Sequence, residues 1–216
     1  MKIYFKQILH ACLLLTFSTV IIAANDPETP DLENILNDAS LISELKRGGY
    51  ILYFRHGKTN HETFDTDRKN LNNCTTQRLL SEEGRKEMTW IGDTIRRLDI
   101  KIGDVISSPY CRSIDTATLA FGSAAINPDL KHTVTADEAT VNRQALVLKE
   151  MLSKIPASKG TNDVISGHTA NLQEATEIWP KPEGVAIVFK PEGNAFNYIA
   201  TIRPTDWQRL LDVAGL

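Results

Sequence analysis

The 216-residue chain has little of what a metal site needs. It contains three cysteines and five histidines, and neither a Cys-x-x-Cys nor a His-x-x-x-His pair occurs among them. The sequence therefore offers no metal site of recognisable spacing. We expect the protein to work without a metal and without any other cofactor.

Positive charge is also in short supply. The chain has 24 Lys and Arg against 27 Asp and Glu, which gives a formal net charge of −3. A net acidic protein is a poor candidate for nucleic-acid binding. Any affinity for phosphate must therefore be local and must come from a few converging arginines. Internal repeats and low-complexity stretches are absent from the sequence as well.

Only the N-terminus carries a long apolar run. Lys2 and Lys6 precede a mostly apolar stretch at 8–22, and Ala23 and Ala24 follow it. This order is typical of a secretory signal peptide. An uncleaved membrane anchor is the alternative, but a run of about 15 residues is short for a span. We expect cleavage after residue 24, a single domain at 25–216, a periplasmic or secreted location and no stable membrane anchor.

Three segments place cation-capable side chains directly after a short apolar run. They are Tyr-Ile-Leu-Tyr-Phe-Arg-His-Gly at 50–57, Asp-Val-Ile-Ser-Ser-Pro-Tyr-Cys-Arg at 104–112 and Asp-Val-Ile-Ser-Gly-His at 163–168. Each run predicts a buried strand, and the second and third are each followed by a segment that can start a helix. Ligands of open α/β sheets bind at the carboxyl ends of the strands. The side chains expected at that edge are Arg55, His56, Arg112 and His168.

The order of elements predicts an α/β fold. Helices are expected at 35–45, 81–98 and 141–153, and a terminal hairpin is expected from 185–189 and 198–202. Repeated strand–helix order favours a mostly parallel sheet with helices on both faces, in three layers.

Together these motifs resemble the histidine phosphatase superfamily, also called the phosphoglycerate-mutase-like group. The resemblance rests on Arg55-His56-Gly57, on Arg112 in Ser-Ser-Pro-Tyr-Cys-Arg and on His168 in Ser-Gly-His, and it spans residues 48–203. Order and spacing fit the smaller branch, which lacks a large inserted helical domain. The layout is similar to that of exported members such as the lipopolysaccharide core heptose-phosphate phosphatases.

The resemblance implies a phosphoglycerate-mutase-like fold and a specific chemistry. It implies a metal-independent phosphomonoester hydrolase that works through a phosphohistidine intermediate. The substrate would be a phosphorylated small molecule or a glycolipid, such as a sugar phosphate of the cell envelope. Rival functions are a phosphoglycerate-mutase-type phosphotransferase, a phosphoprotein phosphatase and a non-catalytic phosphate-binding module.

The residue types at the predicted sheet edge suit this chemistry. Phosphomonoester hydrolysis needs a nucleophile, positive charge around the phosphoryl group and an acid for the leaving group. His56 is the candidate nucleophile, with one ring nitrogen free and the other donating to a carbonyl or a similar partner. Arg55 and Arg112 can each donate two hydrogen bonds to phosphate oxygens. His168 would be a further donor, and the resemblance assigns these four positions the same roles.

The acid is expected downstream of the second arginine. The resemblance places a carboxylate in that region, where Asp137 and Glu138 stand. We favour Glu138 and keep Asp137 as the alternative. A structural alternative is that both residues cap the helix that begins near Val141.

Smaller features refine the prediction. Thr59 follows Gly57 by two residues and could contact the phosphate through its hydroxyl. Glu62 stands where mutases carry an asparagine phosphate ligand, which favours hydrolysis over phosphate transfer. His61 and His132 have no assigned role and are expected at the surface.

Two cysteines, Cys74 and Cys111, would remain after export. Cys74 lies in the long polar loop at 58–78, and Cys111 directly precedes Arg112. We expect a disulfide between them in an oxidising compartment, where it would hold the loop over the pocket. The alternatives are two free thiols and, for the loop itself, a mobile surface segment.

Overall fold

The computed structural model describes residues 32–216. The signal-peptide prediction for residues 1–24, and with it the predicted start of the domain at residue 25, lies outside the described residues. No helix within 32–216 is long and apolar enough to cross a membrane.

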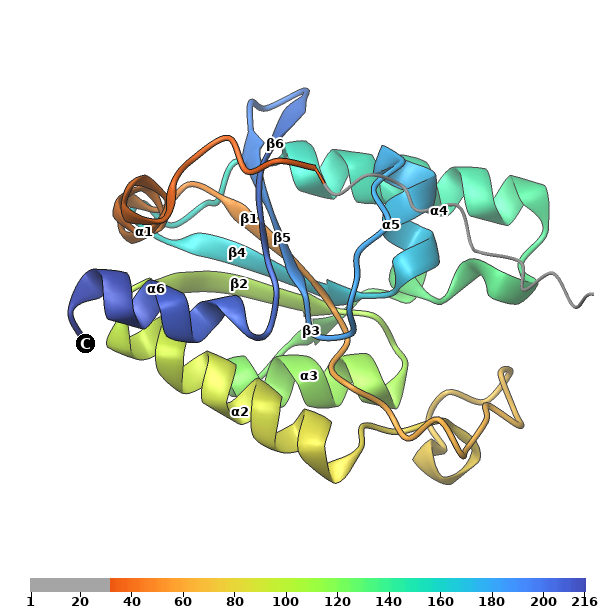
Figure 1. Cartoon of the computed structure of the whole chain (residues 1–216). Helices are drawn as coiled ribbons and strands as arrows, with labels where there is room; N and C mark the ends of the chain where they lie inside the picture. Colours follow the sequence, from red (N-terminus) through yellow and green to blue (C-terminus); the bar gives the residue numbers. More distant parts are fainter. Residues whose placement is uncertain (1–31) are drawn as a thin grey trace, which may run out of the picture. The chain divides into compact units, whose positions relative to one another are not determined.

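The described residues form a six-stranded sheet in the order β3-β2-β4-β1-β5-β6 (Figure 1). The strands are β1 (Ile51–Arg55), β2 (Ile102–Ser107), β3 (Ala125–Ile126), β4 (Asn162–Gly167), β5 (Ala186–Pro191) and β6 (Phe196–Ile202). Strands β1 to β4 pair in parallel, whereas β5 runs antiparallel to both β1 and β6. The predicted α/β architecture and its terminal hairpin are therefore confirmed.

Helices follow most of the strands and cover both faces of the sheet (Figure 1). They are α1 (Asp38–Arg47), α2 (Glu82–Arg97), α3 (Cys111–Phe121), α4 (Glu138–Ser153), α5 (Thr169–Thr176) and α6 (Asp206–Ala214). The side chain of Ser81 accepts a hydrogen bond from the amide of Gly84 and caps α2 as its sequence predicts. The sequence analysis missed α6 and placed the start of α4 three residues too late.

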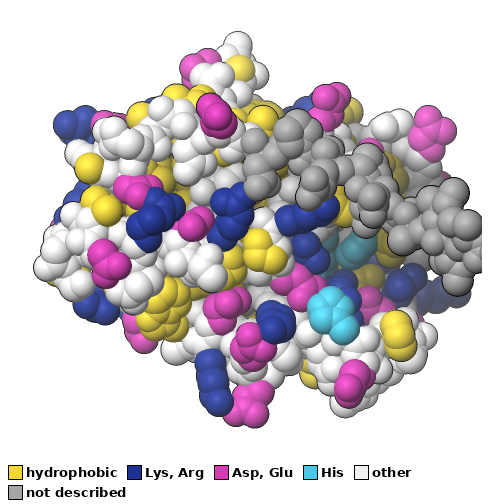
Figure 2. Space-filling view, viewed as in Figure 1, with side chains coloured by type: hydrophobic (Ala, Val, Ile, Leu, Met, Phe, Trp, Pro, Cys, Tyr) yellow, Lys and Arg dark blue, Asp and Glu magenta, His cyan; other side chains and the backbone are white. Residues whose placement is uncertain are grey.

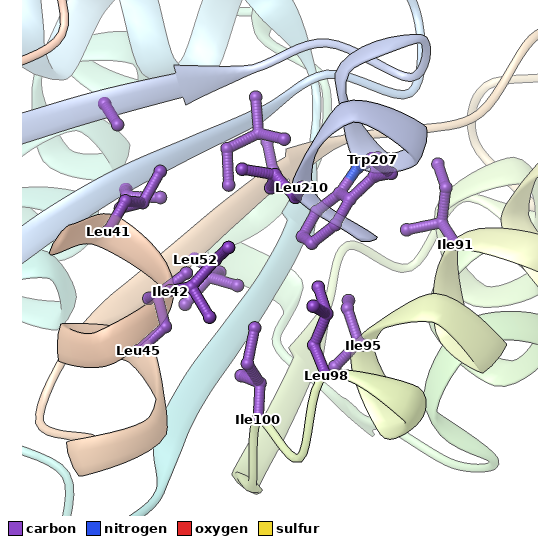
Figure 3. Close-up of a cluster of buried hydrophobic side chains, with 14 of the residues drawn as sticks. Leu41, Ile42, Leu45, Leu52, Ile91, Ile95, Leu98, Ile100, Trp207 and Leu210 are labelled. Atoms are coloured by element: carbon purple, nitrogen blue, oxygen red, sulfur yellow. The ribbon is translucent and has the colours of Figure 1, made fainter. Parts of the chain in front are cut away.

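One face of the sheet packs against α1, α2 and α6. Figure 3 shows Leu45 from α1, Ile95 from α2 and Trp207 from α6 converging on Leu52 of β1. All four side chains are at most 1% exposed. Because side chains alternate across a strand, Leu52 faces this layer while its neighbours face the other.

The opposite face packs against α4 and α5. Ile51 and Tyr53 of β1 form a second cluster with Leu148 and Leu152 of α4 and Leu172 of α5. The sheet is thus buried on both sides, which explains why its central strands are nearly continuous apolar runs.

Cys74 and Cys111 form a disulfide with Cα atoms 5.8 Å apart, which confirms the predicted bridge. Cys74 begins a short 3₁₀ helix (Cys74–Thr76) in the loop at 58–78, and Cys111 begins α3. Next to the bridge, the amide of Cys111 donates to Oε1 of Gln77 at 3.0 Å. The long loop is therefore fixed to the start of α3 at its C-terminal end.

The sheet depends on α6 for part of its cover, and Trp207 is the largest buried side chain on that helix. We expect Trp207→Ala to lower the free energy of unfolding by about 3–5 kcal/mol, because the large cavity cannot close fully. Val213→Ala, on the same helix at a side chain that is 48% exposed, should change it by about 0.5 kcal/mol or less. Urea unfolding of the two variants measures both, and equal losses would contradict this packing.

Candidate active site

Three neighbouring strands, β2, β4 and β1, end at one edge of the sheet and deliver the predicted residues there. Arg55 is the last residue of β1, and His56 follows it. His168 is the N-cap of α5 directly after β4, and Arg112 lies in the first turn of α3 after β2. The amide of His56 donates to the carbonyl of Gly167 at 3.0 Å, which joins two of these strand ends. We call Arg55, His56, Arg112 and His168 the four-residue site.

His56 is 3% exposed and its ring is fixed in one neutral form. Its Nδ1 lies 3.0 Å from the carbonyl oxygen of Gly57. Since a carbonyl can only accept, Nδ1 carries the proton and Nε2 keeps its lone pair. Burial, followed by the charge of Arg112, holds the pKa of His56 well below its usual value. The ring therefore has the form that a nucleophile requires.

His168 is completely buried beside His56, with ring centroids 5.5 Å apart. Its Nε2 lies 2.8 Å from Oγ of Ser108, and Tyr53 donates its hydroxyl to the His168 carbonyl. Burial, and after it the charge of Arg112, also lowers the pKa of His168. Ser108 and Tyr53 thus fix both the ring and the backbone of this residue.

Arg112 is 1% exposed, which is rare for a guanidinium group. One of its terminal nitrogens donates to both carboxylate oxygens of Asp65, at 3.0 and 3.3 Å. Its guanidinium carbon lies 4.3 Å from the centroid of the Tyr110 ring, at cation–π distance. Asp65 belongs to the loop at 58–78, so that loop supplies the counterion for the second arginine.

Arg55 is held from the other side of the edge. It donates to the carbonyl of Pro180 at 3.2 Å, and a terminal nitrogen lies 3.4 Å from the carboxylate of Glu183. The same carboxylate is 4.0 Å from Nδ1 of His56. Glu183 is 8% exposed and precedes β5.

Three nitrogens of the four-residue site are buried and have no hydrogen-bond partner. They are Nε of Arg55, Nε of Arg112 and Nδ1 of His168. Leaving such groups unpaired is costly, and each of them can donate to an anionic oxygen. Each of them is therefore a candidate donor to an anion bound near the lone pair of His56.

Thr59 is buried at the site, but its hydrogen bonds are already used. Its amide and its hydroxyl both donate to the carboxylate of Glu183, at 2.9 Å each. Burial alone would raise the pKa of Glu183, but the two bonds from Thr59 and the charges of Arg55 and His61 outweigh it, and the pKa falls below its usual value. Contact between Thr59 and a phosphate stays a prediction, and it would require the hydroxyl to leave Glu183.

The two acid candidates lie at the start of α4, and both are exposed. Asp137 is the N-cap, and its carboxylate accepts from the amide of Thr140 at 2.7 Å. That hydrogen bond lowers the pKa of Asp137, which makes it a weak candidate for proton donation. Glu138 lies in the first turn and makes no hydrogen bond or ion pair with another described residue. Its role as the acid stays a prediction.

His132 does not lie at the surface as the sequence analysis expected. Its ring centroid is 4.8 Å from that of His168 and 6.3 Å from that of Tyr110. The amide of Val134 donates to Nδ1 of His132 at 3.0 Å, so the neutral ring carries its proton on Nε2. Burial, followed by the charge of Arg112, lowers the pKa of His132 to about 4. The expectation failed because a short 3₁₀ helix (Thr133–Thr135) turns the chain back toward the site.

His61, in contrast, has a side chain that is 65% exposed, as expected, although it contacts Glu183 at 3.2 Å. Arg78 is a third arginine nearby, with one nitrogen 3.9 Å from the same carboxylate. The sequence analysis assigned no role to Glu183, Asp65 or Arg78. For Glu183 there was a usable signal: a strand antiparallel to β1 must begin at the edge where β1 ends.

The charges around the site are mixed. Figure 2 shows basic and acidic side chains interspersed on the face viewed in Figure 1, with histidine side chains among them. Within residues 32–216, no three His, Cys, Asp or Glu side chains gather in a way that could hold a metal ion.

No family model matches the chain, and no curated protein matches it. Solved structures share its fold. A mutant phosphoserine phosphatase from Entamoeba histolytica, in complex with phosphoserine, has a TM-score of 0.50 at 12% identity over 72% of this chain and 97% of that chain. The same enzyme in complex with 3-phosphoglyceric acid gives 0.50 at 14% identity over 70% and 95%. The protein histidine phosphatase SixA complexed with tungstate gives 0.49 at 14% identity over 73% and 98%.

At these identities the likeness shows the fold alone. It confirms the expected phosphoglycerate-mutase-like α/β architecture. The resemblance to exported heptose-phosphate phosphatases finds no counterpart among these structures and stays a prediction.

The half-buried, neutral ring of His132 makes stability depend on pH. The unfolded chain binds a proton below the ordinary pKa of 6.5, while the folded ring resists protonation down to about 4. Stability is therefore lost as the pH falls through this window. Between pH 6.5 and pH 5, His132 should lower the free energy of unfolding of the wild type by about 1.5 kcal/mol, and His132→Gln should not show this loss.

Urea unfolding of both proteins at the two pH values measures this difference. Val134→Ala, a neighbouring change that removes no titrating group, should keep the wild-type dependence. Identical pH slopes for the wild type and His132→Gln would contradict a half-buried, neutral ring.

Proposed function

We propose that this protein is a phosphomonoester hydrolase that works through a phosphohistidine on His56. The observation that carries the proposal is the set of three buried, unpartnered nitrogens on Arg55, Arg112 and His168, beside a histidine whose Nε2 lone pair is free. A phosphoryl group would satisfy these donors with its oxygens and present its phosphorus to Nε2.

The reaction would take place in two steps. The Nε2 lone pair of His56 forms a bond to phosphorus while the bond to the ester oxygen breaks, and an acid gives that oxygen a proton. Water then attacks the phosphohistidine, the P–N bond breaks, and inorganic phosphate leaves with a proton lost to a base. The neutral state of His56, maintained by burial and by Arg112, keeps the nucleophile available near neutral pH.

We propose that no metal is needed, because two guanidinium groups and the ring of His168 supply the donors that would otherwise come from a cation. A phosphorylated small molecule or glycolipid is the proposed substrate, with a sugar phosphate of the cell envelope as the finer proposal. A periplasmic or secreted location is supported by the order of residues 1–24 and by the Cys74–Cys111 disulfide, which oxidising compartments favour.

Two rival functions have less support. In a mutase, a second phosphate ligand is expected where this chain has Glu62, whose exposed carboxylate would repel phosphate. A binding module would not require a histidine held in the nucleophilic tautomer. Solved proteins of this fold include an enzyme named for the hydrolysis of phosphoserine.

A quenched reaction identifies the nucleophile. After incubation with labelled p-nitrophenyl phosphate, the denatured protein should carry phosphate in an acid-labile, base-stable linkage. His56→Ala should lose both turnover and label while keeping its fold by circular dichroism. Wild-type turnover in that variant would refute the mechanism.

The same assay separates the rivals. EDTA should leave the rate unchanged, and vanadate should inhibit competitively. A wild-type protein that binds vanadate but never turns over would favour the binding module.

The leaving group identifies the acid. An alkyl phosphate needs its departing oxygen protonated, whereas p-nitrophenolate leaves without such help. We expect Glu138→Gln to slow alkyl phosphate hydrolysis about 10²–10⁴-fold and to change p-nitrophenyl phosphate hydrolysis far less. Asp137→Asn keeps the cap and is the matched control. If that variant shows the selective loss instead, Asp137 is the acid, and unchanged rates in both variants would exclude the pair.

A further inference from the structure

A hollow of about 480 Å³ lies directly beside the four-residue site. It shares Arg55 with that site, and Glu183 forms another part of its wall. The remaining walls come from Lys58, from the first turns of α2 and from the segment between β6 and α6. Its volume falls within the range of about 300–1,000 Å³ that is usual for small-molecule sites. We call it the side hollow.

The walls of the side hollow combine apolar surface, which includes Pro182 and Pro204, with charged side chains whose signs balance. Its three cations are Arg55, Lys58 and Arg203, and its three carboxylates are Glu83, Glu87 and Glu183. The formal sum of these six charges is zero, with one histidine in addition. Such a lining favours a neutral polar group over a second charged one, since any added charge would meet repulsion from half of the walls.

Glu87 is the member of this lining whose bonding is incomplete. It is half-buried on α2, yet it makes no hydrogen bond or ion pair with another described residue. Lys58, the nearest candidate partner, is instead paired with Glu83 at 2.6 Å. Burial, and after it the charge of Glu83, raises the pKa of Glu87. A carboxylate in this position gains most from a donor that a ligand brings.

The chemistry of the walls indicates which donor fits. A hydroxyl group donates to a carboxylate and accepts from Lys or Arg, so several hydroxyls on one ring can satisfy both kinds of wall. An aromatic or aliphatic group would bring no donor for the carboxylate of Glu87 and would leave it without a hydrogen bond. An ammonium group would satisfy Glu87 but would face Lys58 and Arg55.

We propose that the side hollow binds the leaving-group alcohol of the substrate as a polyhydroxylated, sugar-like group, with Glu87 accepting a hydrogen bond from one of its hydroxyls. This inference rests on the proposed phosphatase function. It adds that Glu87 on α2 contributes to the specificity for the alcohol, in a hollow that Arg55 and Glu183 line and that Arg112 and His168 do not.

Hydrolysis of a substrate panel by the purified protein tests the inference. The panel contains glucose 6-phosphate, mannose 1-phosphate, ribose 5-phosphate and glycerol 3-phosphate, set against phosphoserine, phosphoethanolamine and phenyl phosphate. We expect at least one polyhydroxylated ester to exceed the other three in kcat/KM. Glu87→Ala should raise the KM for that ester about tenfold and change the kcat/KM for phenyl phosphate less than twofold.

Glu82→Ala is the matched control. Glu82 begins α2, its side chain is 82% exposed, and it is no part of the side hollow. It should leave every substrate unchanged. An equal loss on all substrates in Glu87→Ala would mean a structural role and overturn the inference, as would a preference for the amine-bearing esters or for phenyl phosphate.

A binding measurement keeps this test apart from the phosphatase proposal. In the His56→Ala background, at least one of the four polyhydroxylated esters should raise the melting temperature more than inorganic phosphate does, and adding Glu87→Ala should remove that excess. If the wild type hydrolyses no ester, the proposed function fails while this measurement still tests the side hollow. If hydrolysis occurs but no sugar phosphate raises the melting temperature more than inorganic phosphate does, only the proposal for the side hollow is refuted.

Discussion

Two guanidinium groups held nearly out of water at one edge of the sheet are the constraint on which the site depends. A buried cation is tolerated only when it is paired and hydrogen-bonded. Arg112 therefore has Asp65 beside it, and Arg55 has Glu183. Asp65 lies outside the helix that carries Arg112, and Glu183 lies outside the strand that carries Arg55. Charge pairing therefore fixes both the loop at 58–78 and the segment before β5. The remaining unpartnered nitrogens are what a bound anion would satisfy.

The two apolar layers make this arrangement possible. Successive side chains of β1 pack into opposite cores, so the strand that ends in Arg55 is held in place by packing on both faces. Strand β4 lies between β1 and β2 in the sheet. The carboxyl ends of these three strands therefore lie side by side, although the strands are far apart in the sequence. Sheet order, rather than any local motif, thus sets the spacing of the arginines and histidines. The helices that follow β2 and β4 then begin at the same edge.

Much of this could be predicted because strong local patterns coincide with buried structure. The strand runs, the terminal hairpin and the cluster of Arg55, His56, Arg112 and His168 all follow from apolar runs that end in polar residues. The short helix α6 was missed although Trp207, Leu210 and Leu211 stand at helical spacing, so the sequence did carry its signal. His132 was missed because an irregular segment places it, and its position follows from tertiary contacts that a single sequence does not display. Glu183 could have been found, because it precedes a strand that runs antiparallel to β1.

The link between the loop at 58–78 and α3 has a consequence for how the protein matures. Neither apolar core contains the Cys74–Cys111 bond, so the sheet and its helices can assemble without it. The loop that supplies Asp65 to Arg112 is anchored covalently only once both thiols are oxidised. Completion of the fold and completion of the site are therefore separate events. A chain newly made under reducing conditions would have a folded sheet and helices but no covalent link between the loop and α3. An oxidising environment would accept the electrons of the two thiols and form that link.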